Sequence, residues 1–181
     1  MKKLAIVASL VAAFGSVGMA QAASSGTITF NGELTANTCD VVVDGQTADA
    51  TVVLPTVGVN QLNSATKTAG DTGFVMALNN CSGTLQTASA YFEAGASVDS
   101  LTGRLKNLTG SASNVSLQLL DGSSASQAII QAGNANQVMN TTYKDVSGGS
   151  TTLPYTVRYY AEAPTTAGTV VSNVVYSIQY Q

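Results

Sequence analysis

The stretch SNVVYSIQYQ at residues 172–181 decides the fold, because its large apolar residues alternate with smaller or polar ones. A period of two predicts a β-strand with one apolar side. The members of that side are Val174, Tyr176, Ile178 and Tyr180. A strand must find partners for its backbone N–H and C=O groups. The question is therefore which other strand lies beside this one.

A second alternating run, GTITFNGEL at residues 26–34, lies near the other end of the sequence. Ile28, Phe30 and Leu34 fall on one face, so this run also predicts a strand with an apolar side. Several short strands with turn signals between them favour a β-sandwich. Strands are predicted over residues 26–34, 35–43, 50–57, 74–81, 87–95, 114–122, 151–163 and 169–181, with a loop over 59–73 and an ambiguous stretch over 124–142.

The first residues have the pattern of a secretory signal. Lys2 and Lys3 precede the apolar run LAIVASLVAAF, and AQA at residues 20–22 offers small residues for cleavage after Ala22. The apolar run is too short to span a bilayer. We therefore expect an exported chain with no membrane span after signal cleavage.

Charge and composition exclude several classes of function. The formal net charge is −3, and loss of Lys2 and Lys3 with the signal takes it to about −5. A chain with so few cations and no basic patch is not expected to bind nucleic acid. Charged residues make up 9% of the chain and hydrophobic ones 45%, which favours a folded β-protein with a neutral polar surface over a disordered chain.

Cys39 and Cys81 are the two cysteines, and an exported chain with one pair predicts one disulfide. A metal or redox pair is the alternative, but the sequence has no CxxC and no histidine. The lack of histidine also excludes Ser–His and Cys–His nucleophiles. Two distant carboxylates that meet in space would be needed for a glycosidase. We therefore expect no catalytic residue, no metal and no cofactor.

Together these features resemble the chaperone–usher pilins, and among them the major subunits of type 1 fimbriae. The resemblance rests on GTITFNGEL leading into NTC, on LNNC at the second cysteine, on NVSLQLLDG, and on LPYTVRYYAEAPTTAG. Its most specific part is a penultimate tyrosine, Tyr180, with Gly168 fourteenth from the end and alternating apolar residues between them.

The resemblance implies an all-β fold, an incomplete immunoglobulin-like β-sandwich of six strands. The missing seventh strand would be a donor strand from a neighbouring subunit, so that subunits polymerise by donor-strand exchange into an adhesive surface fibre. The implied partners are identical or related pilin subunits, a periplasmic chaperone and an outer-membrane usher. The implied location is the fimbrium at the cell surface, reached through the periplasm.

The resemblance also assigns segments and residues. Residues 1–22 would be the signal peptide, 23–37 the donor-strand extension and 38–181 the pilin domain. The donor strand would use Gly26, Ile28, Phe30 and Gly32. The acceptor groove and chaperone contact would use Gly168, Val174, Tyr176, Ile178 and Tyr180. Ser24 departs from the apolar residue usual at that place, which affects the register of the donor strand. The alternative is a monomeric secreted β-sandwich that binds a carbohydrate or a host protein.

Overall fold

The computed structural model describes residues 26–32, 34, 36 and 38–181. The chain divides into two units, residues 1–33 and residues 34–181. The predicted signal peptide and Ser24 lie outside the described residues. Residues 26–32 have no helix or strand assignment, although the sequence predicted a strand there. An isolated strand has no partner for its backbone groups, so the alternating pattern alone does not produce one.

The regular secondary structure of the second unit is mostly β-strand, which confirms the predicted fold class. Six of its strands have five or more residues, and three have two. The longer strands are β1 (Thr38–Val43), β2 (Thr68–Ser82), β3 (Thr87–Phe92), β5 (Val115–Asp121), β8 (Thr151–Ala161) and β9 (Tyr176–Tyr180). The other elements are β4 (Leu105–Lys106), β6 (Ile129–Ile130), β7 (Lys144–Asp145), a 3-10 helix (Val59–Leu62) and α1 (Gln137–Asn140).

The larger sheet has the strand order β1-β2-β8-β5-β4, with β6 also paired to β5. All of its pairs are antiparallel. Alternation along β8 decides which side faces the core: Tyr155 and Val157 are buried, whereas Arg158 points the other way and donates to the Gln118 side chain on β5. Alternation along β8 therefore separates a core face from an outer face.

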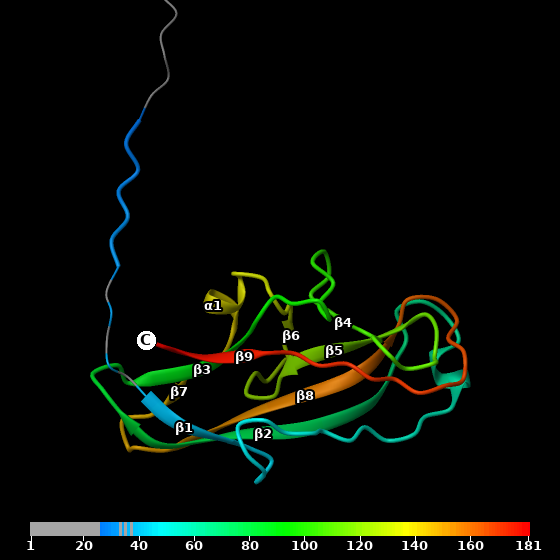
Figure 1. The fold of residues 1–181 in the computed structure, drawn as a ribbon, viewed down its shortest axis with the longest axis horizontal. Coiled ribbons are helices and arrows are strands. Elements are labelled where there is room, and N and C mark those ends of the chain that lie inside the picture. Colours follow the sequence, from blue (N-terminus) through cyan, green and yellow to red (C-terminus); the bar gives the residue numbers. More distant parts are fainter. Residues whose placement is uncertain (1–25, 33, 35, 37) are drawn as a thin grey trace, which may run out of the picture. The chain divides into compact units, whose positions relative to one another are not determined.

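The smaller sheet has the order β7-β3-β9 and lies beside β2, β8 and β5 (Figure 1). In its central pair, Ala90 of β3 is opposite Ile178 of β9, and Phe92 is opposite Tyr176. The core lies between the two sheets. There the Tyr155 ring packs 5.7 Å from the Phe74 ring and edge-on to the Phe92 ring at 5.1 Å between centroids. Aromatic pairs in this geometry add stability beyond the area they bury.

Three segments differ from the sequence prediction. Residues 50–57 form no strand, and β9 begins only at Tyr176, so Val174 precedes it. The predicted loop at residues 59–73 instead contains the 3-10 helix and the first residues of β2. The first two differences have one cause, because residues 50–57 and 172–175 contain β-branched residues but have no strand beside them, among the described residues, to complete a ladder.

Candidate strand-binding groove

A cavity of about 450 Å³ separates the two segments that lack a strand partner. Residues 48–52 line one wall, and residues 172–174 together with Tyr176 line the other. Between them the cavity reaches buried core side chains, among them Met76 of β2 and Leu119 of β5. The hydrophobic core is therefore accessible from this side.

The cavity is one of a row of hollows along the C-terminal segment, which we call the groove. A hollow of about 590 Å³ is lined by residues 165–171, and one of about 650 Å³ by residues 174–178. A small hollow of about 60 Å³ follows at Tyr180 and the two cysteines. Successive parts of residues 165–180 thus line successive hollows, which gives the groove the length and direction of an extended strand.

One edge of β9 faces this groove. The backbone of Gln181 exchanges hydrogen bonds of 2.9 and 3.0 Å with Thr87, and Glu93 N–H donates to the Val175 carbonyl at 2.8 Å. In an antiparallel pair, alternate residues direct their backbone groups to the same neighbour. The backbone groups of Tyr176, Ile178 and Tyr180 therefore point away from β3. Among the described residues β9 pairs with no other strand, so these groups form a free sheet edge.

Two tyrosines of β9 reach from this edge to the opposite wall. The Tyr176 hydroxyl donates to the Ala48 carbonyl at 2.8 Å. Burial raises the pKa of the Tyr176 phenol, and the nearby Asp49 carboxylate adds to the shift. Burial also raises the pKa of Tyr180, against a hydrogen bond from the Cys39 backbone that lowers it. Both phenols thus stay neutral, and each connects β9 to the segment across the groove.

Gly168 lies where two loops pack closely at the far end of the groove. A Cβ atom at residue 168 would lie 2.4 Å from the Ala112 nitrogen, so only glycine fits there. Asn107, which the sequence analysis missed, fixes the same region. Its amide nitrogen donates to the Thr169 carbonyl at 3.2 Å, and its amide oxygen accepts from Val171 N–H at 2.8 Å. The nearby Gly110 is the only sequence signal for this turn, and it does not identify the partner 62 residues away.

The groove is apolar and carries little charge. Asp49 is the one charged residue that lines the 450 Å³ cavity. In the described part of the chain no three Asp, Glu, Cys or His side chains come together as a metal site would require. These walls suit an uncharged strand with apolar side chains better than an ion or a charged substrate.

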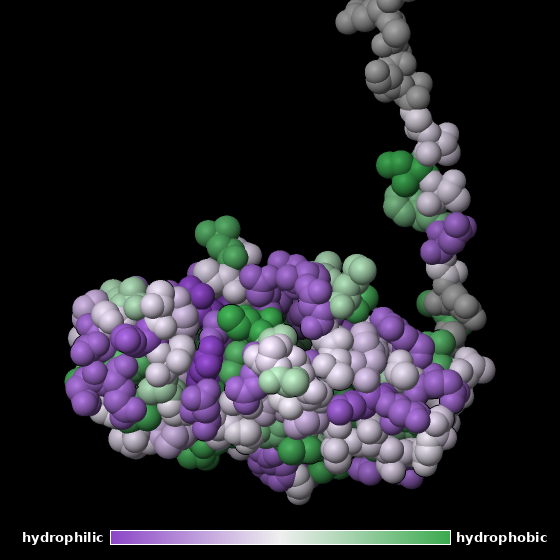
Figure 2. Space-filling view, turned by 180° about the vertical axis from the view of Figure 1, so that it is seen from behind, coloured by the Kyte–Doolittle hydropathy of each residue, from purple (hydrophilic) through white to green (hydrophobic). Residues whose placement is uncertain are grey.

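The predicted donor segment is uncharged between residues 26 and 32 and carries exposed apolar side chains. The side chains of Ile28 and Phe30 are 77% and 88% exposed, and neither Gly26 nor Gly32 has a neighbour where a Cβ would be. Figure 2 shows hydrophobic side chains uncovered in the described part of this segment. The segment has no charged residue between positions 26 and 32. That residues 26–32 act as a donor strand stays a prediction. That the groove residues bind a donor strand also stays a prediction.

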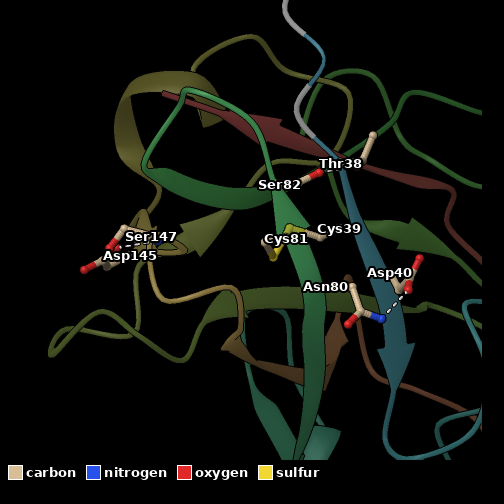
Figure 3. Close-up of a disulfide and its surroundings, with 8 residues drawn as sticks. All are labelled: Thr38, Cys39, Asp40, Asn80, Cys81, Ser82, Asp145 and Ser147. Atoms are coloured by element: carbon tan, nitrogen blue, oxygen red, sulfur yellow. Dashed lines mark hydrogen bonds between the residues drawn. A yellow bond between two sulfur atoms is a disulfide. The ribbon is translucent and has the colours of Figure 1, made fainter.

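The disulfide joins Cys39 at the start of β1 to Cys81 at the end of β2 (Figure 3). Hydrogen bonds on either side of it, one between the Thr38 and Ser82 hydroxyls and one from Asn80 to Asp40, continue the pairing of the two strands. The predicted pair of cysteines is therefore confirmed. Because β1 lies across the groove from β9, the disulfide also fixes one end of the groove.

Comparisons with known proteins agree with this geometry. The protein-family model described as "FimA: Type-1 fimbrial protein, A" matches residues 54–181, which is more than half of the chain. The chain belongs to the type-1 fimbrial protein family. It is 37% identical to the F17 fimbrial protein of Escherichia coli over the full length of both chains. It is 41% identical to the major fimbrial subunit SMF-1 of Stenotrophomonas maltophilia strain K279a, over 90% of this chain and 96% of that one.

A solved structure has the same fold. The P pilus rod subunit PapA superposes with a TM-score of 0.55 at 18% identity, covering 79% of this chain and 99% of PapA. The type-1 fimbrial protein family consists of structural subunits of chaperone–usher fimbriae, and the resemblance found in the sequence is thereby confirmed. No helix in the described residues is both long and apolar enough to cross a membrane.

Proposed function

We propose that the groove of one subunit receives residues 26–32 of another copy, and that repetition of this step builds the fibre. The proposal is supported by the edge of β9, which among the described residues has a strand on one side only and lies beside a hollow that opens onto the core. An added strand would gain main-chain hydrogen bonds from the free edge and side-chain burial in the hollows. No catalytic step is required, and the chain acts as a structural protein.

The two halves of the proposed contact match in chemistry. Ile28 and Phe30 lie on the same face of an extended strand and are mostly exposed before assembly. Burial of such side chains contributes roughly 1.5–3 kcal/mol each. The acceptor side would be lined by Val174, Tyr176, Ile178 and Tyr180, with Gly168 at its far end. Because side chains of a strand alternate, a shift by one residue would turn Ile28 and Phe30 out of the groove, which fixes the register.

An unfilled groove would be hazardous during export, because it combines an unpaired strand edge with apolar surface. We propose that a periplasmic chaperone occupies the groove first, and that an outer-membrane usher exchanges the chaperone for the next subunit. The route would run through the periplasm to the fimbrium on the cell surface. Residues 23–37 would then be the exchanged extension and residues 38–181 the acceptor domain.

A rearranged chain tests this function. Residues 23–37 are moved through a short flexible linker to follow Gln181, so that the segment can fill the groove of its own chain at an effective concentration in the roughly millimolar range. This variant should fold as a stable monomer without a chaperone, whereas the mature chain should multimerise or aggregate. If the unchanged mature chain is equally stable and monomeric, the proposal is wrong, and a monomeric protein that binds a carbohydrate or a host protein becomes the better explanation.

A further inference from the structure

The second edge of β3 is closed with little help from another strand. On the side away from β9, β7 pairs only with Thr87 and Ala88. Alternation places the backbone groups of Ala90 and Phe92 on this same side. Both residues are buried, and a buried N–H without a partner would be costly. The N–H groups of both residues donate to side chains, whereas the Phe92 carbonyl also accepts the Gly133 N–H at 2.8 Å.

Tyr155 supplies the partner for Ala90. It projects from β8 through the core, held between the rings of Phe74 and Phe92. Its hydroxyl accepts the Ala90 N–H at 3.0 Å. The hydroxyl also lies 3.4 Å from Ser89 Oγ. The position that a neighbouring strand's carbonyl would take beside Ala90 is thus occupied by a phenol of the opposite sheet.

Gln137 binds both backbone groups of Phe92, sharing the carbonyl with the Gly133 N–H. Its Oε1 accepts the Phe92 N–H at 3.0 Å, and its Nε2 donates to the Phe92 carbonyl at 3.0 Å. A residue on a paired strand would make the same two bonds with its backbone. Gln137 is only 4% exposed, which is unusual for a glutamine and is explained by these bonds. Its side chain therefore takes the place of a strand at this point.

The surroundings of this edge are otherwise suited to binding. Val138 and Met139, which directly follow Gln137, are 41% and 89% exposed. An open edge next to apolar side chains is what an alternating apolar strand pairs with. If β3 were open here, the segment that is proposed to enter the groove would have a second place to add.

We propose that Gln137 and Tyr155 close the second edge of β3, so that a subunit accepts a donor strand only at β9 and the fibre grows without branches or lateral pairing. This inference rests on the proposed function. It assigns a specificity role to the stretch at residues 124–142, which the sequence analysis could not interpret.

The test uses fibres sheared from cells that make the full chain, and a fluorescent peptide with the sequence of residues 26–34. The variants are Gln137→Leu, which removes both bonds to Phe92, and Tyr155→Phe, which removes only the hydroxyl and keeps the ring. The matched controls are Gln61→Leu at an exposed position and Tyr91→Phe on the opposite face of β3. Hydrogen exchange at the amides of Ala90 and Phe92 is measured on the same fibres.

Wild-type and control fibres should bind peptide only at the free fibre end. In the variants, amide exchange should rise about tenfold at Phe92 for Gln137→Leu and at Ala90 for Tyr155→Phe. Bound peptide should rise toward one per subunit, and electron microscopy should show laterally paired fibres. Unchanged exchange, or faster exchange with no added peptide, overturns the inference. So does loss of fibres in both variants while Tyr91→Phe fibres form normally. If the wild-type chain forms no fibres, the proposed function fails instead.

Discussion

The most informative perturbation is Phe30→Ala, because Phe30 is 88% exposed before assembly and is expected to be buried after it. Burial of a Phe side chain contributes roughly 2–3 kcal/mol. Since about 1.4 kcal/mol corresponds to a factor of ten, truncation should speed release of the strand by about 30- to 140-fold. Most of the effect should appear in the dissociation rate, as is usual for changes within one interface.

The assay follows subunit release from purified fibres in guanidinium chloride by light scattering. Leu101→Ala is the matched control, because Leu101 is also apolar and is 91% exposed but lies outside the proposed contact. The control should release subunits at the wild-type rate. The acceptor domain of Phe30→Ala should unfold as in the wild type. A release rate for Phe30→Ala within about threefold of wild type, or equal effects of the two variants, would refute the reasoning.

Four further outcomes are expected. Gly26→Ile should leave the domain oxidised and folded but abolish surface fibres, seen by electron microscopy; wild-type fibre numbers would exclude a close approach of strands at residue 26. Replacing Cys39 and Cys81 by alanine should cost roughly 2–5 kcal/mol, measured by urea unfolding of the rearranged monomer, and an unchanged midpoint would contradict it. Gly168→Val should lower the melting temperature of that monomer, because a Cβ there would overlap backbone; equal melting would mean that the loops can move apart. Burial raises the pKa of Tyr155, so the stability it contributes is complete below pH of about 10, the unfolded pKa, and is lost as pH rises through the folded pKa. Thermal unfolding across this range should show a weaker decline for Tyr155→Phe than for the wild type, and identical declines would rule out Tyr155 as the cause.

The local sequence pattern was enough to predict most of the strands and the face of the strand on which each side chain lies. In β8, Tyr155 and Val157 lie two residues apart on one face of the predicted strand, and both are buried. The pairing of the two cysteines also followed from their number and from the predicted export signal. These features depend on residues close in sequence or on composition, which are visible without coordinates.

The local sequence pattern gave wrong predictions where strand formation depends on whether a partner strand lies beside the segment. Residues 50–57 are rich in β-branched residues, as strands are, but none of the described strands pairs with them and they become a wall of the groove. Conversely, β2 begins at Thr68 within the predicted loop, because Ala69 and Thr72 find partners on β8 across an irregularity in the register. Whether a segment forms a strand is therefore a property of the pair of segments, which the sequence of one of them does not contain.

An all-β chain with one disulfide and two apolar alternating ends was visible from residue order and composition. Tertiary structure alone decided that the edge of β9 is free while the edge of β3 is closed. The closing bonds join Gln137 to Phe92 and Tyr155 to Ala90, across 45 and 65 residues of sequence. A buried glutamine amide or phenol acquires such a role only when folding brings a particular backbone group within hydrogen-bond distance, because the energy of a hydrogen bond depends on that short-range geometry.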